Sequence, residues 1–113
     1  MRIFISIASY QDKLLPVTIH SAYSAAKYKD NLTFGVVDQC EYKLDFSKSK
    51  IANQITYTHL DPDAARGPCW ARSLAQTLMK DEEYFLQVDS HTIFEKDWDE
   101  YLLNYIKTIK KSH

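Results

Sequence analysis

The sequence predicts an α/β protein, with a mostly parallel sheet flanked by helices, and three observations support this fold class. Short apolar segments with the length of strands alternate with longer segments whose apolar residues recur at helical spacing. The first strand-like segments are apolar on both faces, which is typical of strands covered by helices on both sides. Only two glycines and three prolines occur in 113 residues, so we expect mostly regular structure.

The residue pattern of the amino-terminal part predicts a strand, a helix and a second strand. Residues 2–8 are apolar on both faces of a strand. Pro16 suits the first turn of a helix, and apolar residues then recur on one helical face as far as Ala26. Residues 32–37 form the second buried strand. Two strands joined through a helix predict a parallel crossover unit.

The middle of the chain predicts a strand, a helix and another strand. Residues 54–60 alternate apolar and polar side chains, which indicates a half-buried strand near an edge of the sheet. A helix begins at about Pro68 and carries apolar residues at helical spacing as far as Leu78. Residues 84–88 form the next strand.

The last element is predicted to be a helix that begins at Asp97. The Asp97 carboxylate can cap this helix, and Glu100 completes a capping-box pattern three residues later. We expect one buried apolar stripe along the helix, formed by Trp98, Leu102, Tyr105, Ile106 and Ile109.

Composition limits the class of protein. The length fits a single domain over residues 1–113, and a net charge of -1 gives no basic footprint for nucleic acid. No apolar run approaches the roughly 20 residues that span a bilayer, and no signal peptide is recognisable. Cys40 and Cys69 lack metal-type spacing, so two free thiols in a cytoplasmic protein are the simpler interpretation, although a disulfide stays open.

Polar side chains gather after the predicted strands. The four clusters are residues 9–12, 38–39, 63–67 and 89–91. Each cluster alone fits ordinary turn chemistry. Because the carboxyl ends of parallel strands meet at one edge, where ligands bind, their joint placement predicts a ligand crevice.

Asp89, Ser90 and His91 form the most informative cluster. If strand geometry continues, Asp89 and His91 point to one side and Ser90 to the other. A carboxylate and an imidazole could then share a divalent ion, with Mn²⁺ favoured over Mg²⁺ by the mixed ligands. The alternative is that Asp89 caps a turn and His91 is a surface residue.

Arg66 is the second candidate, since it precedes a helix start at Pro68. Exposed N–H groups at a helix start, together with an arginine, favour a phosphate. Arg72, one turn into the helix, either reaches the same phosphate or is solvated. The alternative for Arg66 is a surface ion pair with Asp61 or Asp63.

Four segments together resemble a known family. They are residues 66–76 (RGPCWARSLAQ), 84–91 (YFLQVDSH), 5–12 (ISIASYQD) and 97–100 (DWDE). They are similar to polypeptide N-acetylglucosaminyltransferases that glycosylate hydroxyproline in cytoplasmic proteins. A more distant likeness is to mucin-type polypeptide GalNAc-transferases, which also carry Asp-Ser-His after a strand.

The resemblance implies a Rossmann-like GT-A fold, a UDP-sugar donor such as UDP-GlcNAc, a Mn²⁺-type cofactor and retention of anomeric configuration. It assigns the metal to Asp89 and His91. It also implies that Arg66 contacts the nucleotide and that Ser9, Asp12 and Asp38 lie near the uridine.

Members of that family continue well beyond the last helix, through an acceptor-binding half. We therefore expect residues 1–113 to be the donor-binding part of a glycosyltransferase, or a naturally short relative, acting on a protein or glycan acceptor. The alternative is a nucleotide-binding or interaction module without transferase activity. A third interpretation, an unrelated phosphate-binding fold, is disfavoured because no glycine-rich phosphate loop is present. An exposed sheet edge would favour a homo-oligomer.

Overall fold

The computed structural model describes residues 1–64 and 67–111. They form a parallel sheet of four strands in the order β3-β2-β1-β4. The strands are β1 (Ile3–Tyr10), β2 (Leu32–Gln39), β3 (Ile55–Leu60) and β4 (Tyr84–Asp89). The helices are α1 (Leu15–Ala25), α2 (Pro68–Gln76) and α3 (Trp98–Lys111), with short 3₁₀ turns η1 (Lys29–Asn31), η2 (Ala52–Gln54) and η3 (Pro62–Ala64).

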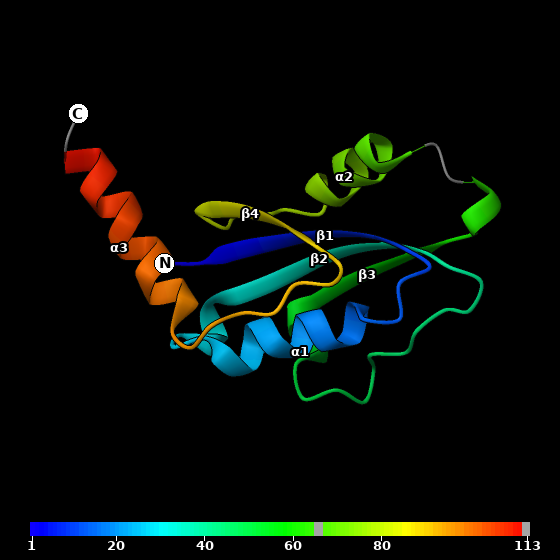
Figure 1. Cartoon of the computed structure of the whole chain (residues 1–113), viewed down its shortest axis with the longest axis horizontal. Helices are drawn as coiled ribbons and strands as arrows, with labels where there is room; N and C mark the ends of the chain where they lie inside the picture. Colours follow the sequence, from blue (N-terminus) through cyan, green and yellow to red (C-terminus); the bar gives the residue numbers. More distant parts are fainter. Residues whose placement is uncertain (65–66, 112–113) are drawn as a thin grey trace.

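Helices cover both faces of the sheet, as the sequence predicts. Figure 1 shows α1 on one face and α2 on the other. The larger core lies on the α1 side and joins the apolar residues of α1 to those of β1 and β2. The smaller core lies under α2. Among the described residues, no helix is both long enough and apolar enough to cross a membrane.

Gly35 in β2 allows close packing on the α2 side. A Cβ atom at this position would lie 2.2 Å from Cζ of Phe4 and 3.3 Å from Cβ of Leu78. The Phe4 ring also stacks on Phe85, with centroids 6.0 Å apart. The Phe4 ring therefore occupies space that any larger residue at position 35 would need.

The order of the strands creates a switch point between β1 and β4. The chain runs from β1 outward to β2 and β3, and then returns through α2 to place β4 on the other side of β1. Connections leave β1 and β4 in opposite directions there, which opens a crevice at the carboxyl ends of the strands.

Two strands extend further than the sequence analysis expects. Ser9 and Asp38, predicted in loops, are the paired and buried penultimate residues of β1 and β2. The pairing continues one step beyond the strands, because Gln11 N donates to Gln39 O (2.8 Å) and Cys40 N to Leu60 O (3.1 Å). The polar side chains at this edge are therefore held by strand backbone.

The expected capping box of α3 is wrong. The Asp97 N–H, which Glu100 would have to accept, donates instead to Ala25 O (2.6 Å). Glu100 pairs with Lys27 at 2.5 Å. Asp99, which is buried, accepts two backbone N–H groups at 2.8 Å, from Lys27 and Tyr28. The start of α3 thus binds the segment after α1.

The expected buried stripe of α3 is correct only near the start of the helix. Trp98 packs on the core and donates its indole N–H to Ala22 O (2.9 Å). Tyr105 and Ile109, further along, are exposed. Figure 1 shows the reason, since α3 projects away from the sheet after its first turns.

Candidate functional site

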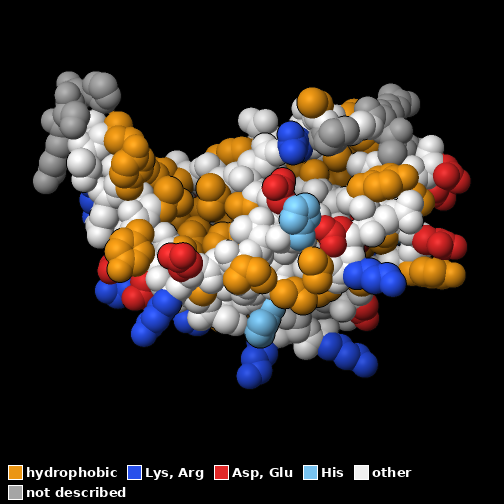
Figure 2. Space-filling view, viewed as in Figure 1, with side chains coloured by type: hydrophobic (Ala, Val, Ile, Leu, Met, Phe, Trp, Pro, Cys, Tyr) orange, Lys and Arg blue, Asp and Glu red, His pale blue; other side chains and the backbone are white. Residues whose placement is uncertain are grey.

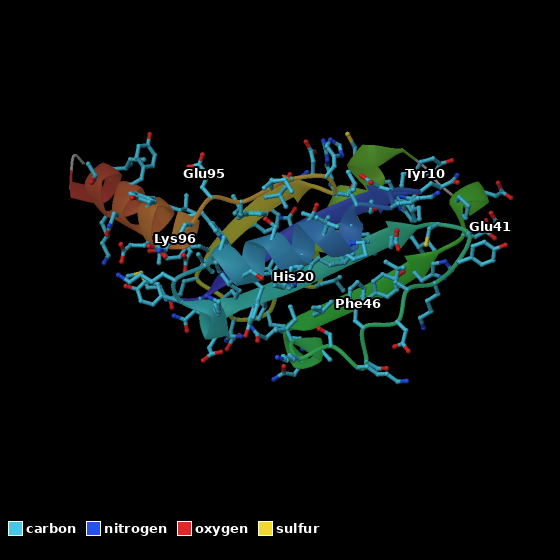
Figure 3. All side chains as sticks on the ribbon, turned by 60° about the horizontal axis from the view of Figure 1, so that its bottom comes forward. Tyr10, His20, Glu41, Phe46, Glu95 and Lys96 are labelled. Carbon is cyan, nitrogen blue, oxygen red and sulfur yellow. The ribbon has the colours of Figure 1, made fainter. Side chains whose placement is uncertain are left out.

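A cavity of about 410 Å³ lies at the switch point of the sheet. It is bounded by the carboxyl ends of β1, β2 and β4 and by the first turns of α2. Tyr10 on its rim is exposed, and Figure 3 shows Tyr10 at the same end of the molecule as Glu41. The lining residues with polar side chains are Ser9, Tyr10, Gln39, Arg72 and Asp89.

Two buried polar atoms in the wall of this cavity lack partners. Ser9 Oγ and Gln39 Oε1 have no hydrogen-bond partner among the described residues. Both side chains are almost fully buried. Because buried polar groups normally have a partner, a polar ligand that donates hydrogen bonds would suit this wall.

A second cavity, of about 290 Å³, lies between residues 11–13 and 38–44. Asp38 forms its buried base. Its Oδ2 accepts a hydrogen bond from the Tyr57 hydroxyl (2.6 Å) and another from Cys40 Sγ (3.1 Å). The carboxylate is therefore held in one orientation at the end of β2.

Tyr57 organises the loop above Asp38. Its hydroxyl accepts the backbone N–H of Leu44 (3.0 Å) while donating to Asp38. Burial, and then the Asp38 carboxylate, raise the pKa of Tyr57, so this hydroxyl stays protonated. His59 Nε2 lies 2.7 Å from Cys40 O and supports the same loop.

Sequence reasoning missed Tyr57 and Cys40 as site residues. The available signal was weak, since Tyr57 occupies an inward position of a half-buried strand, where tyrosine is common. Both cysteines are free, as the simpler interpretation expected. Burial raises the pKa of the Cys40 thiol, with Asp38 adding to the effect.

The Asp89–Ser90–His91 segment turns away from the sheet. β4 ends at Asp89, and the next two residues form a turn. Asp89 and His91 are exposed while Ser90 is buried. Strand geometry therefore stops at Asp89, so the condition on which the sequence placed Asp89 and His91 on one side is not met. Figure 2 shows acidic and histidine side chains gathered at the centre of this face, below α2.

Asp12 contacts two residues of this segment. Its Oδ2 accepts a hydrogen bond from Ser90 Oγ at 2.6 Å and lies 3.2 Å from His91 Nδ1. The hydrogen bond from Ser90 lowers the pKa of Asp12, and contact with His91 adds to the effect. The carboxylate is thus ionised at neutral pH.

Thr18 of α1 holds the backbone of the same turn. Its buried hydroxyl donates to Ser90 O (2.7 Å) and accepts the N–H of Thr92 (3.1 Å). The hydroxyl thus acts as a donor and as an acceptor, and both hydrogen bonds fix the backbone of the turn. Asp12 therefore holds the side chains and Thr18 holds the main chain.

The structure brings some of the expected residues together and leaves others apart. Ser9, Arg72 and Asp89 border the first cavity, whereas Asp12 and Asp38 border the second. Arg66 lies outside the described residues. Within the described part of the chain, no three His, Cys, Asp or Glu side chains form a metal cluster, so Asp89 and His91 offer at most two ligands there.

A parallel sheet with polar cavities at its switch point defines this chain as an α/β protein with a ligand crevice at the carboxyl edge. The chain belongs to the Glycosyltransferase (GlcNAc) family, whose model matches residues 40–113. A comparison with curated proteins gives no match.

A solved structure supports the fold. The chain superposes on the crystal structure of S. aureus TarS with a TM-score of 0.71 and 20% sequence identity. The match covers 96% of this chain and 20% of the TarS chain. The expected α/β arrangement of a parallel sheet flanked by helices is confirmed. The chain spans about a fifth of the length of the protein that it resembles.

Proposed function

We propose that this chain binds the nucleotide-sugar donor of a glycosyltransferase that transfers GlcNAc from UDP-GlcNAc to an acceptor hydroxyl with retention of configuration. Family membership supports the reaction class. The observation that carries the donor site is the gathering of strand-terminal polar residues around two cavities at the carboxyl edge of the sheet. The protein acceptor implied by the resemblance is a hydroxyproline hydroxyl.

The cavity at Asp38 suits the uridine. A carboxylate can only accept hydrogen bonds, so Asp38 would recognise the N3–H of uracil or a ribose hydroxyl. Tyr57 and Cys40 restrain this carboxylate in the absence of ligand. Asp12, which borders the same cavity, would lie between the nucleoside and the metal.

The cavity at the switch point suits the diphosphate and the sugar. Ser9 Oγ and Gln39 Oε1, without partners among the described residues, can take hydroxyl hydrogens. Arg72 lines this cavity near the start of α2 and would offset phosphate charge. Arg66 would act at the same end of α2, as the sequence analysis expects.

Asp89 and His91 would hold a divalent ion, for which Mn²⁺ fits a mixed carboxylate and imidazole set. Asp89 ends β4 and His91 lies in the turn that follows, and both side chains are exposed, so both are accessible to an ion. When bound, the ion would stabilise the negative charge that develops on the departing UDP. Two protein ligands leave positions for diphosphate oxygens and water.

The test is UDP binding with and without Mn²⁺, measured by calorimetry. Asp89→Ala should lower Mn²⁺-dependent affinity at least about tenfold, because it removes one of two protein ligands. Asp81→Ala is the matched control, since Asp81 is an exposed carboxylate that pairs with Arg2 at 2.7 Å, at the opposite end of the sheet. Equal affinity in wild type and Asp89→Ala would rule out the metal assignment.

The second candidate is a nucleotide-binding module without transferase activity. This function is favoured because the described residues offer only two candidate metal ligands, Asp89 and His91. Release of free GlcNAc or transfer from UDP-GlcNAc separates the two functions. Mn²⁺-dependent UDP binding without either reaction would favour the module.

A further inference from the structure

Asp12 uses its two oxygens for different purposes. Oδ1 accepts the backbone N–H of Leu14 at 2.9 Å, which fixes the carboxylate to its own loop. Oδ2 is directed at the turn after β4, where it contacts Ser90 and His91. A single side chain therefore connects the loop after β1 to Ser90 and His91, which lie 78 and 79 positions further along the chain.

The contact with His91 selects one form of the ring. An ionised carboxylate has no proton to give, so Nδ1 must carry the hydrogen between the two groups. In a neutral imidazole with a proton on Nδ1, Nε2 carries a lone pair. Nε2 is therefore the atom that a metal ion would bind. Free histidine in water favours the opposite tautomer, so the protein must impose this one.

The contact differs from an ordinary exposed ion pair. His91 is 63% exposed and Asp12 is 20% exposed, so the carboxylate is the fixed partner. The Ser90 hydroxyl bonds to the same oxygen from a buried position, and Thr18 fixes the backbone of the turn. The carboxylate and the turn are thus restrained independently, which lowers the entropy cost of orienting His91.

We propose that Asp12 is the positioning residue for His91: it holds the imidazole as the Nδ1–H tautomer and directs Nε2 outward as a metal ligand. This inference rests on the proposed metal role of His91. It gives Asp12 a function that differs from the uridine contact that the resemblance implies.

The first measurement is made without metal. Long-range ¹H–¹⁵N spectra of protein labelled with [¹⁵N]histidine report the tautomer of each of the four histidines. The spectra are recorded near pH 8, where an ordinary histidine is neutral. The signal missing from His91→Ala assigns His91. We expect the Nδ1–H form in wild type and in Ser90→Ala, and the Nε2–H form in Asp12→Ala. An Nε2–H form in wild type overturns the proposal, whatever the metal does.

The second measurement is a Mn²⁺ titration in the presence of UDP, followed by electron paramagnetic resonance. Asp12→Ala should weaken Mn²⁺ binding by about 10–100-fold, the usual effect of losing an outer-shell carboxylate. Asp12→Asn should recover part of the affinity, because its amide oxygen can still accept the Nδ1 hydrogen.

Asp45→Ala is the matched control. Asp45 makes the same type of local turn, with Oδ1 accepting the N–H of Ser47 at 2.9 Å, in the loop after β2. It should change neither measurement. If His91→Ala loses Mn²⁺ while Asp12→Ala keeps full affinity, the positioning role is overturned and the proposed function stands. If both variants bind Mn²⁺ like wild type, the metal role of His91 falls together with this inference.

Discussion

Side chains in this crevice acquire their properties from neighbours that are distant in the sequence. Asp38 is a polar residue after an apolar run, and residue type alone predicts a turn there. In the structure it is buried and bonded to Tyr57, 19 residues away. Cys40 likewise has no activating partner in the sequence, and in space its neighbour is a carboxylate that disfavours the thiolate.

Cys40 should alkylate slowly. Its pKa is raised above that of an ordinary thiol, first by burial and then by Asp38, so at pH 8 it holds less thiolate than an ordinary thiol. Iodoacetamide modification, followed by mass spectrometry, should proceed more slowly in Cys69→Ser, which keeps Cys40, than in Cys40→Ser, which keeps the exposed Cys69. The Cys40 rate should still be rising above pH 9. A rate that levels off below pH 8 would contradict the shift.

At the scale of elements, the sequence predicts the type of each helix and strand better than its ends. Strand periodicity stops where side chains become polar, whereas β1 and β2 continue as long as the backbone finds partners. The start of α3 shows the same limit. The capping box is a local pattern, but a hydrogen bond to Ala25 uses the N–H that the box requires.

Asp99 should be a major contributor to the docking of α3. Its carboxylate satisfies the N–H groups of Lys27 and Tyr28 from a buried position. Asp99→Ala should lower the free energy of unfolding by about 2–3 kcal/mol, because charge-assisted hydrogen bonds are lost and their donors are left unpaired. Urea denaturation measures this change. Glu100→Gln, which removes the charge that pairs with Lys27 and accepts the Tyr28 hydroxyl near the surface, should have much less effect.

At the scale of the whole molecule, packing between layers restricts β2. Gly35→Ala would place a methyl group against the Phe4 ring, with contacts at 2.2 and 2.7 Å. We expect a loss of about 1–3 kcal/mol in the free energy of unfolding. The test is a double-mutant cycle in urea with Phe4→Leu, whose smaller side chain should accommodate the methyl group. Strictly additive effects would show that Phe4 is not the obstacle.

The exposed apolar surface of α3 predicts self-association of this chain. Figure 2 shows hydrophobic side chains gathered in the hollow between α3 and the sheet. Tyr101, Tyr105 and Ile109 are exposed on α3, and β4 pairs on one side only among the described strands. Sedimentation should detect association that Tyr105→Glu weakens. Tyr42→Glu, at an exposed tyrosine in the loop after β2, should leave it unchanged.

The sequence by itself determined the α/β class, the order of elements, and the polar character of the carboxyl edge. These features follow from periodicity and residue type, which can be read from residues that are close together in the sequence. The tertiary structure alone decided which polar groups meet. Asp12 reaches His91, Tyr57 reaches Asp38, and Asp99 reaches the segment after α1, across 19 to 79 residues of chain. Such contacts depend on strand order and on register, and no local pattern records either of them.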